Sequence, residues 1–515
     1  PPPFSSRRRH TRSSVESRGL GDVYKRQFYY GVLFNCAVLA MVLAATVRIS
    51  ELFLRFDLWL PVWLFEPIVE LVRHVGVPLA VDPTGSEVWT RSASNLISVV
   101  SIYAFTVLYS ATGGLRSVVR TDLGQLGLLA AATGAYAWLA ADAVGGFGAL
   151  APALAATVGE ARAESLLALD PWRAADVSGA LLGVIGLQWL AQMNSDGTGY
   201  LAQRCMACRT PEEARRAPVI FAFAQVGLRT LLWAPILISL LVLFPLGAAP
   251  EAAVRELDFV QGMERVLPPG IRGLMLVGML AALASTLDTH LNWGASYLSN
   301  DLYARGVCRG LLGRVAEGRE LVWVARFSAP VLMGISLAVM AALGSIQAAW
   351  HVSLLLGAGL GLPLWMRWLW RRASVWSELA ALLVSALAAP WLLAFVETEA
   401  VRLLGMAALG AGAATLAALL GPREDPARLD AFYERVRPPG FWGNPEARER
   451  LRRGLVGTAA AAVSLFAGLI AGVTILVGAP PPPGMGRELW IVLLVSAALI
   501  ALPVWLRRLH EGEVD

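Results

Sequence analysis

Residues 271–303 read IRGLMLVGMLAALASTLDTHLNWGASYLSNDLY. The run is longer than the roughly 20 residues that an α-helix needs to cross the hydrocarbon core of a bilayer. From Gly273 to Ala284 it is wholly apolar, and hydroxyl, amide and carboxyl groups follow from Ser285 onward. Backbone polar groups must be paired within lipid, so this stretch predicts a membrane-spanning helix with polar side chains in its second half.

The rest of the chain is also strongly apolar. Of its 515 residues, 56% are hydrophobic and 16% are charged, whereas a soluble domain has about a quarter charged residues. This composition excludes a soluble enzyme, a disordered chain and a secreted disulfide scaffold, and it predicts an all-α, polytopic membrane protein. About twelve segments are apolar and long enough to span a bilayer: 28–50, 93–113, 122–144, 178–202, 217–247, 271–303, 323–348, 350–371, 376–395, 400–420, 454–477 and 488–506.

Arginine is concentrated in alternate connections between these segments. By the positive-inside rule those connections face the cytoplasm, and the assignment holds at every crossing. We therefore expect a multi-pass protein of a prokaryotic plasma (inner) membrane with a cytoplasmic C-terminus. The arginine-rich connections are 114–121, 203–216, 304–319 and 367–372, followed by a cytoplasmic loop at 421–453 and the tail after residue 506.

Residues 1–27 are expected to be foreign to the protein. Glu16–Gln27 reads ESRGLGDVYKRQ, which matches the in-frame translation of a transposon-end sequencing adaptor. Such segments are set aside before the fold is considered. Residues 1–27 carry seven basic and two acidic side chains, which is the whole of the net charge of +5. The remainder is electrically balanced, and we expect no nucleic-acid partner.

The polar residues of 271–303 share one side of the predicted helix. At 100° per residue, Ser285, Asp288, Thr289, Asn292 and Ser296 fall within about a quarter-turn of one direction. Polar groups inside membrane helices are costly, and oxygen atoms are the ligands that a hard monovalent cation prefers. The face therefore favours a cation or solute site. The alternative is that its hydroxyls only hydrogen-bond to neighbouring helices.

A second candidate site lies in 178–202, where Asn194–Gly199 (NSDGTG) interrupts an apolar helix. Free backbone groups within a membrane are tolerated only beside a cavity or inside protein, and transporters bind solutes at such breaks. Alternatively, Asn194 begins a cytoplasmic loop. The candidate solute-binding or coupling residues of this segment are Gln188, Gln192, Asn194 and Asp196.

Arg229 lies near the middle of segment 217–247, with Gln225 one turn earlier on the same face. An arginine at that depth must pair with a carboxylate or with an anionic solute. Asp196 and Asp288 are the candidate carboxylates. We therefore treat Gln225 and Arg229 as further candidates for solute binding or coupling.

The sequence contains no motif of a nucleophilic or phosphate-binding enzyme site, and we expect neither an enzyme nor an organic cofactor. Cys205 and Cys208 have C-x-x-C spacing, but a zinc site would need two more ligands and the chain has no second such pair. The glycine-rich stretch Gly357–Pro363 is either an unwound point of a helix or a place of close packing.

Three motifs follow one another along the chain. They are Tyr109–Gln125, with its Gly-Gly-Leu and Thr-Asp, then Gln203–Arg204 with Glu213–Arg215, and finally Ala281–Ala282, Ser285–Leu287, Asn292 and Asp301–Tyr303 in the first helix quoted. Together these motifs resemble those of the sodium:solute symporter family. Thr289–Tyr297 is similar to one poorly characterised bacterial branch of it.

The resemblance implies an inverted-repeat (LeuT-type) transporter core that couples sodium entry to solute uptake, with sodium as the coupling ion and no other metal. The main sodium site would use the backbone carbonyl of Ala282 and the hydroxyls of Ser285 and Thr286. Asp122 corresponds to a residue associated with sodium exit or a second ion. The implied solute contacts are Thr289 and the positions around 191–194.

The family's first two core helices would precede Phe28. We therefore expect 28–375 to hold core helices 3 to 10, 376–515 to add further transmembrane helices, and the chain as given to be inactive. The expected function is sodium-coupled import of a small polar organic solute across the lipid bilayer by alternating access. The alternatives are proton coupling on the same scaffold, through Asp288, and a solute-sensing membrane domain that does not transport.

Overall fold

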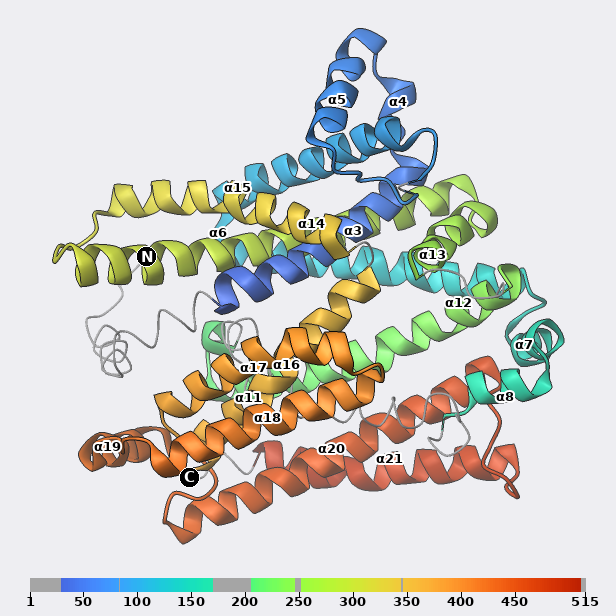
Figure 1. Ribbon diagram of the computed structural model, residues 1–515. Coiled ribbons are helices and arrows are strands. Elements are labelled where there is room, and N and C mark those ends of the chain that lie inside the picture. The colour runs from blue at the N-terminus through green and yellow to red at the C-terminus, as the bar shows by residue number, and fades with distance from the viewer. Residues whose placement is uncertain (1–28, 83, 170–204, 246–251, 344–345, 511–515) are drawn as a thin grey trace. The chain divides into compact units, whose positions relative to one another are not determined.

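The computed structural model describes residues 29–82, 84–169, 205–245, 252–343 and 346–510 (Figure 1). Within these ranges the regular structure is helical, apart from one isolated bridge, and the predicted all-α fold is confirmed. Up to residue 245 the elements are η1 (Tyr29–Phe34), α3 (Asn35–Phe53), α4 (Phe56–Trp59), α5 (Val62–Val75), α6 (Val88–Asp142), η2 (Phe147–Ala149), α7 (Leu150–Val158), α8 (Glu160–Leu167), α11 (Pro211–Ala222), η3 (Phe223–Leu228) and α12 (Arg229–Leu243). The remaining elements are α13 (Ala252–Val266), α14 (Pro269–Ser296), η4 (Tyr297–Leu311), α15 (Gly318–Leu343), α16 (Ile346–Leu369), α17 (Val375–Phe395), α18 (Glu399–Leu420), α19 (Pro426–Val436), α20 (Pro445–Val477) and α21 (Arg487–His510).

Nine helices in the described part of the chain are long and apolar enough to span a membrane, and each overlaps one predicted segment. Of the other three predictions, 93–113 lies in the first half of α6, 350–371 overlaps the shorter apolar helix Ser353–Leu369, and 178–202 lies outside the described residues. A multi-pass membrane protein is thus confirmed. The nine spans are Asn35–Phe53, Thr121–Asp142, Pro211–Leu243, Pro269–Leu311, Gly318–Ala342, Val375–Phe395, Glu399–Leu420, Pro445–Val477 and Arg487–Leu509.

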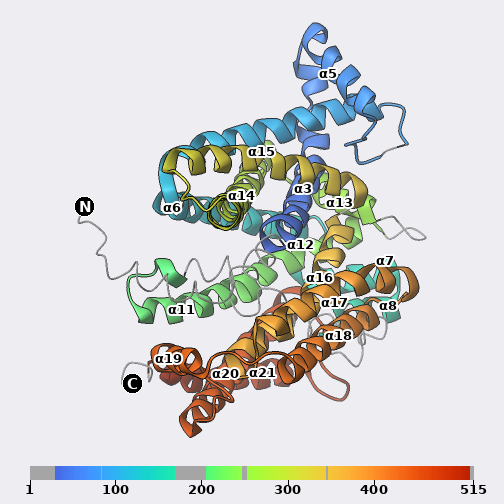
Figure 2. The ribbon, with the colours of Figure 1, turned by 60° about the vertical axis from the view of Figure 1, so that its left-hand side comes forward.

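Helix α6 differs from the sequence prediction, which placed a loop at 114–121 between two segments. Its backbone is helical over 55 residues without a break. Figure 2 shows the ribbon of α6 turning back between its two halves. The pair Gly113–Gly114 lies near the middle of the helix, and glycine pairs are common sites of sharp kinks. The two predicted segments are therefore joined by bent helix instead of a loop.

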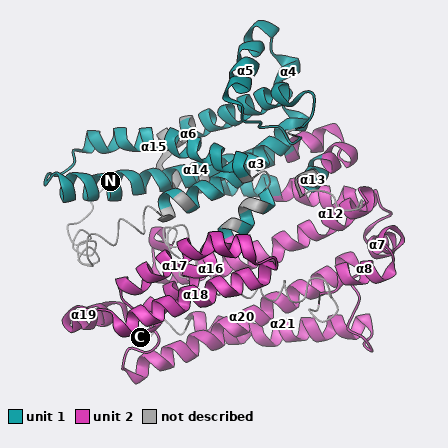
Figure 3. Ribbon diagram, in the orientation of Figure 1, with its two compact units in different colours: residues 1–129, 251–260, 276–353 teal, residues 130–250, 261–275, 354–515 magenta. Residues whose placement is uncertain are grey.

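The helices form two compact units, each of which is described by itself (Figure 3). Unit 1 comprises residues 1–129, 251–260 and 276–353. Unit 2 comprises residues 130–250, 261–275 and 354–515.

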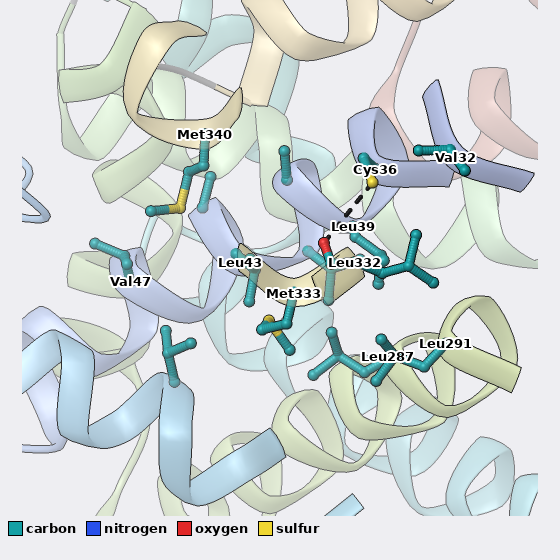
Figure 4. Packing of buried hydrophobic residues seen from close by; sticks show 14 residues of the cluster. Val32, Cys36, Leu39, Leu43, Val47, Leu287, Leu291, Leu332, Met333 and Met340 are labelled. Atoms are coloured by element: carbon teal, nitrogen blue, oxygen red, sulfur yellow. Dashed lines mark hydrogen bonds between the residues drawn. The ribbon is translucent and has the colours of Figure 1, made fainter. Parts of the chain in front are cut away.

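In unit 1, helix α3 is buried on nearly all sides. Its side chains Leu39 and Leu43 are fully buried and belong to one apolar cluster with Leu287 and Leu291 of α14 and Leu332 of α15 (Figure 4). A helix that is apolar all round is expected at the centre of a packed bundle. Helix α3 therefore lies in the core of unit 1 and packs against α14.

Two short helices, α4 and α5, lie between α3 and α6 and project from α6 in Figure 1. With 14 residues, α5 is too short to span a bilayer. Its residues Phe65, Val69 and Val72 recur at helical spacing and pack against the first turns of α6. Before α4, Arg55 donates hydrogen bonds of 2.9 and 2.6 Å to Asp57, which holds the pKa of Asp57 below its usual value.

In unit 2, helices α16, α17 and α18 pack closely at two glycine residues, Gly359 and Gly410. Helix α16 is continuous through Gly357–Pro363, so this stretch is a place of close packing and not an unwound point. A Cβ atom added to Gly410 of α18 would overlap the backbone of Gly359, and one added to Gly359 would overlap Ser385 of α17. Small residues allow membrane helices to approach this closely.

Replacement of Gly410 by alanine should therefore destabilise the protein by about 1–3 kcal/mol, because the backbone atoms that it would meet cannot move aside. Gly412 is the matched control, since it lies two residues further along α18 and an added Cβ would meet nothing there. Thermal unfolding in detergent compares the two variants. Equal unfolding temperatures for Gly410→Ala and Gly412→Ala would contradict the assigned contact.

The predicted loop 421–453 contains α19 and the start of α20, and its middle docks on the end of α16. Phe441 donates its backbone N–H to the Leu369 carbonyl at 2.5 Å. The Trp442 indole donates to the Trp368 carbonyl at 2.7 Å, and Trp442 is buried. These bonds satisfy carbonyls that the helix end leaves without intrahelical partners.

Candidate functional site

Helices α6 and α14 of unit 1 bring together two of the predicted sodium-binding residues. The hydroxyl of Ser285 donates a hydrogen bond to Asp122 Oδ1 at 2.6 Å, across 163 positions of sequence. Both side chains are half-buried. A hydroxyl–carboxylate bond of this length is in the range of strong, charge-assisted hydrogen bonds. The pair places two oxygen-bearing side chains at one point between two helices.

Thr286 and Ala282 form a second oxygen pair, on an adjacent face of α14. The Thr286 hydroxyl donates to the Ala282 carbonyl at 2.9 Å, which is the usual bond of a threonine to the carbonyl one turn earlier. The hydroxyl oxygen retains acceptor capacity in this bond. All four residues predicted for sodium are therefore present as two pairs of oxygen atoms, Ser285 with Asp122 and Thr286 with Ala282.

Asp288 is buried, and it accepts a hydrogen bond from a residue of its own helix. Asn292 donates to Asp288 Oδ1 at 2.5 Å, from a side chain that is itself exposed. The spacing of four residues is the one at which helical side chains meet. Thr289, one residue further, is half-buried. On the predicted polar face of α14, Ser285 thus bonds to Asp122 of α6, and Asp288 bonds to Asn292.

Gln225 and Arg229 belong to unit 2. Gln225 lies in the π-helical turn η3 and is half-buried, while Arg229 opens α12 and is exposed. Turns of π-helix inside α-helices are frequent at functional sites. The pairing of Arg229 with Asp196 or Asp288 stays a prediction, because Asp196 lies outside the described residues and Asp288 belongs to unit 1. Gln188, Gln192 and Asn194 also lie outside the described residues.

The sequence analysis missed two polar residues that meet near these pairs. Asn35, the first residue of α3, is fully buried, and its amide contacts both the ring and the backbone of His290 in α14. The only local signal was an asparagine within an apolar run, which is costly in a membrane helix unless it has a partner.

Cys205 and Cys208 form a short turn, in which the Cys208 N–H donates to the Cys205 carbonyl at 3.3 Å. Both thiols are half-buried, and neither forms a disulfide bond. Among the described residues there is no group of three or more His, Cys, Asp or Glu side chains placed to hold a metal ion.

Comparison with known proteins relates this chain to transporters. The model of the sodium:solute symporter family matches residues 91–373. The chain is 27% identical to a sodium/mannose cotransporter of Bos taurus, over 47% of this chain and 43% of that protein. It is 24% identical to a sodium/glucose cotransporter of Vibrio parahaemolyticus, over 50% and 48%. The osmoregulated proline transporter of Bacillus subtilis is 26% identical over 55% and 54%.

The chain spans about half the length of the curated relatives that it matches. Among solved structures, a Na⁺-coupled sialic acid symporter in a substrate-bound, outward-open state aligns with a TM-score of 0.48 and 18% identity, over 78% of each chain. The matched family and relatives are transporters and not enzymes.

Proposed function

The chain belongs to the sodium:solute symporter family, and we propose that it couples sodium entry to the import of a small polar organic solute by alternating access. The observation that carries the proposal is the 2.6 Å hydrogen bond from Ser285 to Asp122. It joins the helix with the Ser-Thr pair to the helix with the Thr-Asp motif. Carboxylate, hydroxyl and carbonyl oxygens are the donors that a hard cation takes in place of water.

Sodium would be bound by oxygen atoms of α14 and α6. We assign Ala282, Ser285 and Thr286 as ligands, with Asp122 either completing the site or receiving the ion on its way out. When the ion is absent, the Ser285 hydroxyl satisfies the Asp122 carboxylate, which avoids an unpaired charge in a membrane helix. An ion that binds one conformation more tightly shifts the population toward it, and this is how sodium would prepare the solute site.

We assign the remaining polar candidates to solute binding or coupling. These are Asp288, Thr289 and Asn292 of α14, Gln225 and Arg229 of unit 2, and Gln188, Gln192, Asn194 and Asp196 of the predicted broken helix. Arg229 would favour a solute with a carboxylate, because a guanidinium binds that group through two parallel hydrogen bonds.

The proposal also includes the location, the orientation and the domain organisation of the protein. We place the protein in a prokaryotic plasma membrane with its C-terminus in the cytoplasm, because arginine is concentrated in alternate connections of the sequence, which the positive-inside rule assigns to the cytoplasm. Residues 28–375 would form core helices 3 to 10 of an inverted-repeat transporter, and 376–515 would add peripheral transmembrane helices. Residues 1–27 would be adaptor sequence.

Uptake by the full-length protein in proteoliposomes tests the function. Glucose, mannose, proline and sialic acid, the solutes named for the relatives, form the first panel. We expect an inward sodium gradient to drive uptake at fixed pH, and choline in its place to stop it. Uptake driven by a proton gradient without sodium would instead favour proton coupling, for which Asp288 is the candidate. Solute binding without uptake under either gradient would favour a sensing domain.

A further inference from the structure

Asn35 is a polar residue in an apolar environment, at a contact between α3 and α14. Its side chain is fully buried, and its neighbour Cys36 belongs to the apolar cluster of unit 1. Asn35 Nδ2 donates to the carbonyl oxygen of His290 at 2.9 Å. Asn35 Oδ1 lies 2.7 Å from His290 Nδ1. One amide therefore contacts both the backbone and the side chain of a single residue 255 positions away.

These two contacts determine which atoms carry hydrogen. The His290 carbonyl can only accept, so the NH₂ group of Asn35 must face it and the amide cannot be flipped. Asn35 Oδ1 then faces the ring, and it can also only accept. Nδ1 of His290 must therefore carry a proton. The arrangement holds the imidazole in one orientation and the amide in one rotamer.

The helices are closely packed around this contact. A Cβ atom added to Gly294 of α14 would come within 2.5 Å of both Asn35 Nδ2 and Leu332 Cδ1. One added to Gly31 would come within 2.8 Å of Tyr297 Cβ. Gly294 thus faces side chains of α3 and α15, and Gly31 of η1, directly before α3, faces Tyr297 of η4, directly after α14. Sliding or rotating α14 against α3 would break the amide contacts, and lipid offers no water to replace them.

We propose that Asn35 is a positioning residue for the sodium site, because it fixes the axial position and rotation of α14 through His290. His290 is one helical turn beyond Thr286 and five residues beyond Ser285. A helix held at His290 holds the Thr286–Ala282 oxygen pair in place and holds Ser285 opposite Asp122. The role rests on the proposed sodium-coupled function. Partners that orient a ligand in this way typically change ion affinity by about 10- to 100-fold when they are removed.

The test compares variants of the full-length protein by the sodium concentration that gives half-maximal uptake, by maximal rate and by unfolding temperature. Asn35→Leu removes both contacts at similar volume, and Asn35→Asp keeps the size but loses the donor to the His290 carbonyl. His290→Asn retains a donor near the position of Nδ1, whereas His290→Leu removes it. Asn300→Ala changes an exposed asparagine further along the same helical span and is the control.

We expect half-saturating sodium to rise at least about tenfold in Asn35→Leu, Asn35→Asp and His290→Leu. His290→Asn and the control should stay within about threefold of the wild type. The double variant Asn35→Leu/His290→Leu should be no worse than either single variant, because both remove the same contact.

A purely structural role would lower the unfolding temperature of Asn35→Leu and His290→Leu and leave their half-saturating sodium unchanged, which would overturn the inference. An equal rise in half-saturating sodium in His290→Asn and His290→Leu would also overturn the inference. This comparison remains informative if Asn35→Leu does not fold. Wild-type uptake that is independent of sodium would overturn the proposed function together with this inference. Sodium-dependent wild-type uptake with unaffected variants would overturn the inference alone.

Discussion

Replacement of both Ser285 and Thr286 by alanine should abolish sodium-dependent uptake while leaving the protein folded. The change removes two of the proposed oxygen ligands and leaves the Asp122 carboxylate without the hydroxyl that donates to it at 2.6 Å. A hydrogen bond to a charged group contributes about 1.5–3 kcal/mol, and we take the same range for the contact of a hydroxyl oxygen with sodium. Loss of each hydroxyl should therefore raise half-saturating sodium about ten- to a hundredfold.

The measurement is initial uptake over a range of sodium concentrations at fixed pH, with unfolding temperature as the check on folding. Ser328→Ala in α15 is a matched control, because that hydroxyl is buried and donates to the carbonyl one turn earlier, as Thr286 does. It should transport as the wild type does. A double variant with unaltered sodium dependence would remove Ser285 and Thr286 from the ion site. Asp122→Asn, made separately, would then show whether the carboxylate acts without them.

The membrane spans could be predicted from the sequence because their signal is local. An apolar run such as 376–395 has few alternatives to a helix in lipid, and the structure places α17 at Val375–Phe395. The junction at 114–121 was predicted less well, since two apolar runs around a polar stretch indicate a loop. A helix can nevertheless continue through such a polar stretch, as α6 does.

Contacts between residues that are far apart in the sequence were harder to predict. Periodicity placed Ser285, Asp288 and Asn292 on one face of α14, and the bond between Asp288 and Asn292 follows from their spacing of four residues. The family resemblance linked both Ser285 and Asp122 to sodium, but the sequence did not predict the contact between them. The contact of Asn35 with His290 had no signal beyond an asparagine within an apolar run, because only the packing of α3 on α14 brings the two residues together.

The ion pair of Arg48 could be predicted no better, because Arg48 is buried in the last turns of the apolar helix α3. Its Nε atom is 3.2 Å from Glu256 Oε2 of α13, and the two side chains are 6% and 16% exposed. Glu256 Oε1 also accepts the backbone N–H of Gln347, in the first turn of α16, at 3.1 Å. One carboxylate thus compensates a buried cation and the positive end of a helix.

Replacement of Glu256 by alanine should therefore destabilise the protein by about 3–5 kcal/mol, because it removes the carboxylate from a buried ion pair with Arg48. Glu70→Ala is the matched control. It breaks an ion pair of 2.6 Å with Arg73 whose side chains are 51% and 58% exposed, and exposed pairs contribute about 1 kcal/mol or less. Unfolding temperatures in detergent should fall strongly in the first variant and little in the second.

The double variant Arg48→Met/Glu256→Met separates the charge from the packing. Replacing a buried ion pair by apolar side chains of similar volume is often neutral, so this variant should regain most of the stability that Glu256→Ala loses. If it unfolds as early as Glu256→Ala, the contact of Glu256 with the start of α16 is the more important of its two bonds. If Glu256→Ala unfolds no earlier than Glu70→Ala, then Arg48 is solvated or paired elsewhere, and α13 does not hold α3 through this carboxylate.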